Sequence, residues 1–318
     1  MHGRGRAGAR AGGKIANAVR PVELAEAVNT DKSVQQRVTG GVLSVRRSLK
    51  LLELMSEGEY LWSLADISRR LDVNKAIALR LIDELRAAGF VYRDEATGGY
   101  LLTYKLSNLG LRKLAQTRLL DQSSGVLNEL ANSTGELVRL GVVEFGTRVT
   151  WVLAFVGARR TLHIDPNYRL DVQLNTHAAG KAWLATLPPE KAWGILQATG
   201  VAKCTKFSKT KRSDIESDLQ AARDRGFASS YEENELGVGA IAAPIMVRMA
   251  TGKLACVGVI SVAAPTSRMS VSELATLAPM LLRGVAKLSN IWPIGERGLQ
   301  SLVGPSTDAD LMQLQASG

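Results

Sequence analysis

The residues best placed to do chemistry in this sequence are two cations in the stretch "LADISRRLDVNKAIALRLIDELRAAGF", which runs from Leu64 to Phe90. Lys75 and Arg80 fall on the face of a predicted amphipathic helix that packing leaves free. Exposed cations on such a face can bind the phosphates of a nucleic acid. The alternative is a helical hairpin whose cations are simply solvated. The elements around the stretch decide between these two interpretations.

No residues spaced as a catalytic or metal site accompany them. His163 and His177 lack metal-ligand spacing to Cys204 or Cys256, so we expect no bound metal. Three acidic residues occur close together and are most simply the rim of a loop: Glu232, Glu233 and Glu235. Acid–base catalysis would need a second convergent pair, and neither a Gly-x-Ser-x-Gly elbow nor a phosphate loop is present. We therefore expect no catalytic residues and no cofactor.

The bulk properties of the chain limit its class. Its 318 residues are enough for two domains with tails, and a formal net charge of +10 favours a polyanionic partner. Two cysteines far apart exclude a disulfide framework. The N-terminus lacks the apolar core of a secretory signal, and the run "LACVGVISVAAP" from Leu254 is shorter than the ~20 residues of a membrane helix. We expect a soluble cytoplasmic protein with no membrane partner.

Helical patterns surround the two cations. A first helix is expected to begin near Ser44, a good N-cap, and a second to cover Leu64–Leu71. Asp72 and Asn74 can both cap the third helix. The third helix should bury a stripe made of Ala78, Leu81, Ile82 and Leu85.

Two β-favouring runs, Phe90–Arg93 and Tyr100–Thr103, follow these helices with the turn residues "DEATGG" between them. Three helices and a hairpin predict a winged helix-turn-helix, whose third helix can enter the major groove of DNA. The residues that we expect to contact DNA lie on the first helix, the third helix and the hairpin: Arg46, Arg47, Lys75, Ala76, Ile77, Leu79, Arg80, Arg93 and Thr97.

The remainder of the chain has a different pattern of predicted elements. A helical pattern from Leu106 to about Leu130 has no strong breaker before Gly125 and suits a stiff connector. Short strands are then predicted at "LVRLGVV", "VTWVLAFV", "TLHI" and "YRLDVQL", and two longer ones at "GAIAAPIMV" and "LACVGVISVA". Predicted helices cover Ala178–Ala185, Pro189–Gln197, Ser213–Arg225 and Ser270–Ser289. This order indicates an α+β domain with a mainly antiparallel sheet.

These patterns divide the chain into five segments. Residues 1–40 form a basic arm that we expect to be disordered, although such an arm can also enter a minor groove. The remaining segments are the winged helix-turn-helix at 41–104, a connector helix at 105–120, a second domain at 121–293 and a disordered tail at 294–318.

Four stretches in this order resemble the IclR-type bacterial transcriptional regulators: "SVRRSLKLLELM", "AAGFVYRD", "HAAGKAWLA" and "RGFASSYEENELGVGAIAAPI". The resemblance covers roughly Gly41 to Trp292. It implies an N-terminal winged helix-turn-helix and a C-terminal effector-binding domain of GAF-like fold. It also implies double-stranded operator DNA and a small-molecule effector as partners, bound by a homodimer or a dimer-of-dimers tetramer.

The third helix departs from the family pattern. It opens with Asn74-Lys75-Ala76-Ile77, where the family has Pro-Lys-Ser-Thr, so two hydroxyls that would bind phosphate are missing. Ile77 and Leu79 are instead candidates to lie against thymine methyl groups.

The effector site also departs from the family pattern, which holds a small organic acid through a Gly-small pair and several polar side chains. Arg169 and Leu170 stand at that pair, and Asn175 replaces a histidine. Ser261 alone matches the polar set. The resemblance places effector binding at Arg169, Leu170, Ser230, Ala240, Ser261 and Ala263, with Arg169 as a cation that could pair with a carboxylate.

The alternating residues Trp151, Leu153 and Phe155 should share one strand face and belong to the core, with a pocket wall as the lesser interpretation. Together these observations predict a ligand-responsive transcriptional regulator of a catabolic operon, and the resemblance favours a repressor. The regulator would sense a small organic acid, aromatic acids included. Two alternatives remain open: an enzyme that processes a small carboxylate, and a sensor or assembly subunit that does not bind DNA.

Overall fold

The computed structural model describes residues 42–57, 60–158, 164–166 and 172–292. The predicted arm at 1–40 and tail at 294–318 lie outside the described residues. None of the helices in the described ranges is long and apolar enough to span a membrane.

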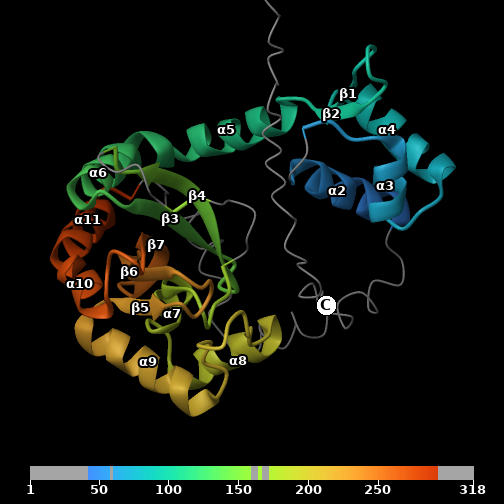
Figure 1. The fold of residues 1–318 in the computed structure, drawn as a ribbon. Coiled ribbons are helices and arrows are strands. Elements are labelled where there is room, and N and C mark those ends of the chain that lie inside the picture. The colour runs from blue at the N-terminus through green and yellow to red at the C-terminus, as the bar shows by residue number, and fades with distance from the viewer. Residues whose placement is uncertain (1–41, 58–59, 159–163, 167–171, 293–318) are drawn as a thin grey trace, which may run out of the picture. The chain divides into compact units, whose positions relative to one another are not determined.

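The N-terminal part contains the three predicted helices (Figure 1). They are α2 (Leu43–Ser56), α3 (Leu64–Arg70) and α4 (Lys75–Ala87). Ser44 is not the N-cap of α2, because the helix begins one residue before it, at Leu43. The predicted stripe of α4 is buried with Leu51 and Ile67 in one apolar core, where burial of each large side chain contributes about 1.5–3 kcal/mol.

The predicted wing follows α4. Strands β1 (Val91–Arg93) and β2 (Tyr100–Leu102) pair antiparallel, with Val91 opposite Leu102. Asp94 accepts hydrogen bonds from the backbone N–H and the hydroxyl of Thr97, which closes the turn between the strands. The hydrogen bond from the Thr97 side chain is the main cause that lowers the pKa of Asp94.

The predicted single helix from Leu106 to Leu130 is two helices, α5 (Lys105–Thr117) and α6 (Leu119–Thr134). They are separated by Arg118, whose φ of 54° lies in the left-handed region and interrupts the helical hydrogen bonds. No breaker residue marks this position in the sequence, so the pattern could not reveal it. The connector helix thus ends before Arg118.

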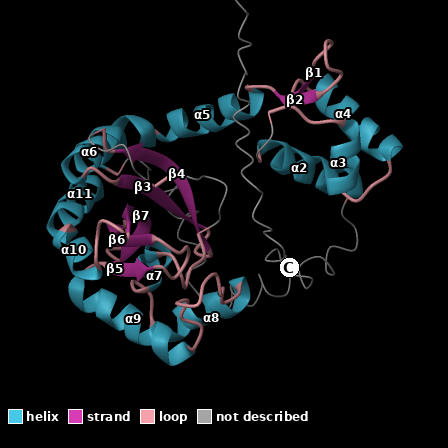
Figure 2. Ribbon diagram, viewed as in Figure 1, coloured by secondary structure: helices cyan, strands magenta, loops and turns pink. Residues whose placement is uncertain are grey.

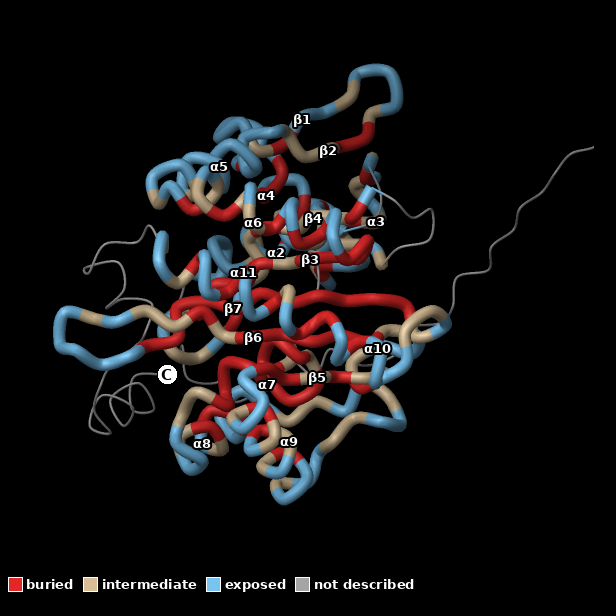
Figure 3. The backbone as a smooth tube through the Cα atoms, turned by 90° about the vertical axis from the view of Figure 1, so that its left-hand side faces the viewer, coloured by how far each residue is buried: buried red, intermediate tan, exposed pale blue. Residues whose placement is uncertain are grey.

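The C-terminal part is built on an antiparallel sheet of five strands in the order β4-β3-β7-β6-β5. The strands are β3 (Leu137–Glu144), β4 (Arg148–Val156), β5 (Ala228–Tyr231), β6 (Val238–Arg248) and β7 (Leu254–Pro265). Figure 3 shows β7 buried along almost its whole length, and β6 is buried at Gly239–Ala243 and at Ile245. The predicted α+β class with an antiparallel sheet is confirmed.

Helices cover both faces of this sheet (Figure 2). Helix α6 packs against β3 and β4, and α11 (Ala278–Ile291) packs against β6, β7 and α6. On the other face α7 (Ala178–Leu184) lies against β5, β6 and β7, and α9 (Arg212–Arg225) lies beside it. Helix α8 (Pro189–Thr199) joins the core of this second face. The sheet is therefore buried on both sides.

Two further predictions differ from the structure. The predicted helix Ser270–Ser289 is divided at Leu277 into α10 (Val271–Thr276) and α11, because Pro279 sits at the start of α11 and cannot continue a preceding helix. Residues 172–174, the described part of the predicted strand "YRLDVQL", form no strand and instead lead through a turn into α7. Most of "TLHI" lies outside the described residues, and Ile164, its last residue, is in no strand.

Candidate functional site

The first candidate site is the exposed face at the start of α4. Asn74 caps the helix by accepting a hydrogen bond of 2.9 Å from the backbone N–H of Ile77. Asp72, the other candidate cap, has a φ of 52° and lies in the corner between α3 and α4. The cap leaves the remaining N–H groups of the first turn free for an anion.

Two cations lie on this face. Lys75 and Arg80 are both exposed, and in the described part of the chain neither makes an ion pair. By contrast Arg86, in the last turn of the same helix, pairs with Asp83 at 3.1 Å. Positive charge that is not neutralised therefore concentrates in the first two turns of α4.

The apolar residues of the same face differ in exposure. Ala76 is exposed and Leu79 is 38 % exposed, so both are open to a partner. Ile77 is half-buried and packs against the apolar core of the three helices. Only part of Ile77 is thus available for contact with a base.

The other predicted DNA contacts lie on α2 and the wing. Arg46 and Arg93 are exposed, and Arg47 is half-buried. The guanidinium of Arg93 lies 6.0 Å from the ring centre of Tyr100. Thr97 is exposed, but its hydroxyl is already engaged with Asp94. It therefore shapes the wing whether or not it contacts DNA.

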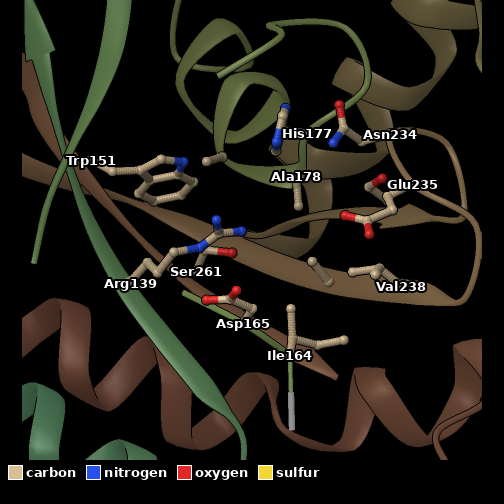
Figure 4. A pocket seen from close by; sticks show the side chains of 13 residues that line it. Arg139, Trp151, Ile164, Asp165, His177, Ala178, Asn234, Glu235, Val238 and Ser261 are labelled. Atoms are coloured by element: carbon tan, nitrogen blue, oxygen red, sulfur yellow. The ribbon is translucent and has the colours of Figure 1, made fainter. Parts of the chain in front are cut away.

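The second candidate site is a cleft on the α7 face of the sheet (Figure 4). Ser230 on β5, Ala240 on β6 and Ala263 on β7 are successive cross-strand neighbours, and Ser261 lies two residues along β7. The structure therefore brings these four predicted residues together. Ser230, Ala240 and Ser261 line the cleft, whereas Ala263 is buried and is not part of the lining.

Trp151 also lines the cleft, and its predicted alignment with Leu153 and Phe155 is wrong. Leu140 pairs with Leu153 but Gly141 pairs with Trp151, so β4 carries one extra residue at Val152. This β-bulge turns Trp151 to the α7 face, while Leu153 and Phe155 pack in the opposite core. An alternating pattern in the sequence cannot show such a bulge.

Arg139 on β3 is a lining residue that the sequence interpretation missed. Its guanidinium lies 4.2 Å from the ring centre of Trp151, and its backbone partner across the ladder is Ser261. The only hint in the sequence is one charged residue inside the apolar run "LVRLGVV". The cleft thus contains a half-buried cation stacked on an aromatic ring.

His177, which precedes α7, is a second missed lining residue. Its Nδ1 accepts a hydrogen bond of 3.0 Å from the backbone N–H of Gln173. Burial, helped by the nearby charge of Arg139, lowers the pKa of His177 to about 4. The ring is therefore neutral at pH 7, and because Nδ1 is an acceptor, the proton is on Nε2.

The close approach of α7 to the preceding turn fixes His177 in this position. A Cβ atom at Gly180 would lie 2.4 Å from the Cα atom of Leu174, so no other residue fits there without a backbone shift. The "HAAGKAWLA" motif therefore has a steric reason for its glycine.

The loop between β5 and β6 forms another wall of the cleft. Asn234 and Glu235 line it, and Asn234 Oδ1 accepts a hydrogen bond of 3.0 Å from the hydroxyl of Thr176. Glu233 is not a solvated rim residue, because it lies 7 % exposed against Lys181 of α7. The Lys181 Nζ atom is 2.6 Å from Glu233 and 2.7 Å from Asp218 of α9. This buried network holds the loop on α7.

Asp165 completes the charged lining that the structure describes. Arg169, Leu170 and His163 lie outside the described residues. Asn175, which stands at the family's histidine position, is fully buried and bonds to the backbone of Ala202 and Lys209. It supports the neighbouring loop and is not among the lining residues of the cleft.

Within the described ranges, no group of three or more His, Cys, Asp or Glu side chains is arranged to hold a metal ion. Cys204 is exposed and Cys256 is buried, and burial raises the pKa of the Cys256 thiol to about 12. Cys256 is therefore a protonated core residue at neutral pH.

Comparisons with known proteins match both parts of the chain. Residues 44–95 match the IclR helix-turn-helix domain, and residues 111–290 match the C-terminal domain of the bacterial transcriptional regulator IclR. The regulator XynR of Escherichia coli is 26 % identical over 250 residues, which cover 78 % of this chain and 96 % of XynR.

Solved structures share the fold. A regulator from Alicyclobacillus acidocaldarius has a TM-score of 0.67 at 25 % identity, over 79 % of this chain and 98 % of its own. An IclR homologue from Microbacterium hydrocarbonoxydans, solved with 4-hydroxybenzoate, has a TM-score of 0.64 at 19 % identity, over 78 % of this chain and 98 % of its own.

Proposed function

This chain belongs to the IclR family of bacterial transcriptional regulators, and we propose that it binds operator DNA through α4 and an effector in the cleft beside Trp151. The observation that carries the DNA-binding part is the capped N-terminus of α4 with Lys75 and Arg80 exposed beside it. The first turns of such a helix can enter the major groove, while the wing reaches the neighbouring backbone.

In this proposal, Lys75, Arg80 and the free N–H groups of α4 bind DNA phosphates. Three further arginines contact the flanking DNA backbone: Arg46, Arg47 and Arg93. Ala76 and Leu79 lie against base edges and thymine methyl groups, and the exposed part of Ile77 can join them. Thr97 contributes mainly by shaping the wing, because its hydroxyl bonds to Asp94.

The effector part rests on the convergence of Arg139, Trp151, His177 and Ser261 around one cleft. Such a combination of apolar walls and a few polar groups is typical of a small-molecule site. The Microbacterium structure was solved with 4-hydroxybenzoate, which supports an organic acid as the effector. The controlled genes would then form a catabolic operon for such an acid, in the bacterial cytoplasm.

Regulation would work by linkage. An effector that binds better to one state of the protein shifts the population towards that state, and DNA affinity changes by the same coupling free energy. Helix α5 connects the two matched domains in sequence and is the natural element to carry the effect.

We further propose a homodimer as the DNA-binding unit, with a dimer of dimers as the larger form. Val42, Val45 and Leu49 form an exposed apolar stripe at the start of α2, and α5 exposes Leu106 and Leu109. A dimer would read two half-sites about one helical turn of DNA, or a multiple of it, apart.

The test of α4 is a gel-shift assay with the DNA that flanks the gene of this protein. Replacing both cations, Lys75→Ala with Arg80→Ala, should weaken binding about tenfold or more, because two phosphate or base contacts are lost. Arg86→Ala is the matched control, since Arg86 lies on the same helix but pairs with Asp83. Unchanged binding by the double variant would overturn the assigned reading face.

The rival interpretation as an enzyme finds no support in the cleft. The carboxylates of Asp165 and Glu235 are exposed, and the neutral His177 is held by Gln173. The relatives are named as transcriptional regulators. The rival of a sensor without DNA binding is tested by the same gel-shift assay.

A further inference from the structure

The wing and the segment before α3 are joined by a line of opposed residues. Trp62, which precedes α3, exchanges two backbone hydrogen bonds of 2.8 Å with Tyr100 of β2. Arg93 of β1 stands opposite Tyr100 on its other side. Because directly opposed residues of antiparallel segments point to the same face, Trp62, Tyr100 and Arg93 line up across three neighbouring segments.

Both ends of this line carry an arginine. The guanidinium of Arg70, the last residue of α3, lies 5.0 Å from the ring centre of Trp62, and that of Arg93 lies 6.0 Å from the ring centre of Tyr100. Both rings are buried, whereas both arginines are exposed. A guanidinium over an aromatic face is attracted by the ring and keeps its N–H donors for another partner. We call Arg70, Trp62, Tyr100 and Arg93 the arginine–aromatic row.

Trp62 is an expensive residue for an apolar core. Its Nε1–H is buried and has no hydrogen-bond partner among the described residues. A buried donor without a partner destabilises the fold, and an aliphatic side chain would fill the core without one. Of the aromatic side chains, tryptophan binds a cation best. The contact with Arg70 therefore gives a reason for a tryptophan at this position.

The arginine–aromatic row is held firmly at both ends. A Cβ atom at Gly99 would lie 2.6 Å from Cγ of Leu61, so the base of the wing is in close contact with the segment before α3. Arg70 is four residues before Asn74, the cap of α4. The row therefore extends from the corner before α4 to the wing.

The two arginines of the row are oriented by rings and not by carboxylates. Neither Arg70 nor Arg93 forms an ion pair within the described ranges. Two acidic residues of the same elements are engaged elsewhere, since Asp66 pairs with Arg69, and Asp94 closes the turn of the wing. The row thus presents two exposed positive charges in set positions.

The width of the row suits the backbone of DNA. The segments that carry Trp62 and Arg93 are two strand spacings, or about 10 Å, apart. Phosphates of one DNA strand follow each other about every 3.4 Å along the helix axis. The two arginines are therefore far enough apart to bind different phosphates of one strand.

We propose that the arginine–aromatic row is a clamp for the DNA backbone, in which Arg70 and Arg93 bind phosphates and Trp62 positions Arg70. Arg70 is then a DNA contact outside the set proposed above for α2, α4 and the wing. This inference rests on the proposed DNA binding of the protein. Because a phosphate carries no base sequence, the row adds affinity without adding specificity.

The test is fluorescence anisotropy of two labelled duplexes with the full chain over a series of salt concentrations. One duplex has the DNA that flanks the gene, and the other has an unrelated sequence of the same length. Arg70→Ala should weaken binding about fivefold to tenfold at about 0.1 M salt and make the salt slope shallower by about 1, because one phosphate contact is lost. The loss should be the same for both duplexes. Arg70→Ala with Arg93→Ala should make the slope shallower by about 2.

Arg69→Ala is the matched control, since Arg69 is the neighbouring residue of the same helix but pairs with Asp66. It should keep the wild-type slope. The wild-type slope in Arg70→Ala, or an equal loss in Arg69→Ala, would overturn the proposal.

The role of Trp62 has a separate readout. Trp62→Leu removes the ring under Arg70 but leaves every charge in place, and it should weaken DNA binding about twofold to fivefold. In the Arg70→Ala background it should cause no further loss, because no guanidinium is left to position. Trp62→Phe, which keeps a ring, should recover most of the affinity, and thermal unfolding verifies that each variant is folded. Equal losses in both backgrounds would contradict the positioning role.

The variant Lys75→Ala with Arg80→Ala is measured in parallel. If this variant binds DNA more weakly and Arg70→Ala does not, the inference alone is wrong. If the affinity of the wild type does not depend on salt, the proposed DNA binding fails with it.

Discussion

The imidazole of His177 shows how burial sets the chemistry of one side chain. Its pKa falls from 6.5 to about 4, chiefly because burial disfavours the charged ring, and Arg139 adds repulsion. In the unfolded chain the same ring takes up a proton near pH 6.5. Between these two values the unfolded state binds more protons, so the folded state loses stability as the pH falls from about 6.5 to about 4.

The difference between the folded-state and unfolded-state pKa of His177 predicts a pH dependence of stability that this one residue causes. Between pH 7 and pH 5, the free energy of unfolding of the wild type should fall about 2 kcal/mol more than that of His177→Gln. Urea unfolding of both proteins at pH 7, 6 and 5 measures this difference. Parallel losses of stability in the two proteins would show that His177 is not buried as a neutral ring.

At the scale of elements, the buried ion pair between α7 and the β5–β6 loop is the feature with the largest expected effect. Lys181 is 1 % exposed, and its ammonium lies between Glu233 and Asp218. Burial raises the pKa of Glu233, although the charge of Lys181 opposes this rise. Removing the lysine would leave the buried Glu233 carboxylate without its ion-pair partner, and only the charge of Lys209 farther away would act on it.

Lys181→Met should therefore lower the free energy of unfolding by about 3–5 kcal/mol. The double variant Lys181→Met with Glu233→Leu should be less destabilised than Lys181→Met alone, because the uncompensated charge is gone. Asp218 keeps its ion pair with Lys209 in both variants. Urea unfolding measures both variants against the wild type, and a double variant that is more destabilised than Lys181→Met alone would contradict the pairing.

The elements also show what the sequence can reveal. The buried stripe of α4, the Asn74 cap and the wing follow from local spacing, and each was predictable. The convergence of Ser230, Ala240 and Ser261 was predictable only through the family resemblance. The bulge at Val152 and the break at Arg118 depend on strand pairing and backbone conformation, for which local residue patterns contain no information.

Residues that act through distant partners were hidden for the same reason. In the sequence Glu233 is one of several acidic residues in a loop, and only the folded chain shows that it pairs with Lys181 of α7. In the sequence Arg139 is a single charged residue in an apolar strand, and only the folded chain shows that its guanidinium stacks on Trp151. In both cases the partner is far away in sequence, so its identity is a property of the folded chain.

At the scale of the whole molecule, the exposed apolar residues of α2 and α5 predict self-association. Leu49 is 56 % exposed and Leu109 is 42 % exposed. The variant Leu49→Glu with Leu109→Glu should sediment as a monomer, whereas the wild type should sediment as a dimer or tetramer, because buried like charges oppose association. Leu254→Glu is the matched control, since Leu254 is similarly exposed, at 58 %, but lies in β7 and not in α2 or α5. A wild type that sediments as a monomer would contradict the proposed dimer.

The central claim is that α4 binds DNA through Lys75 and Arg80, and the salt dependence of affinity for a short DNA duplex tests it most directly. Phosphate contacts release counterions, so the logarithm of the binding constant should fall steeply with the logarithm of salt concentration. In the variant Lys75→Ala with Arg80→Ala, we predict a slope that is shallower by about 2. A wild-type slope near zero, or the same slope in both proteins, would contradict the claim.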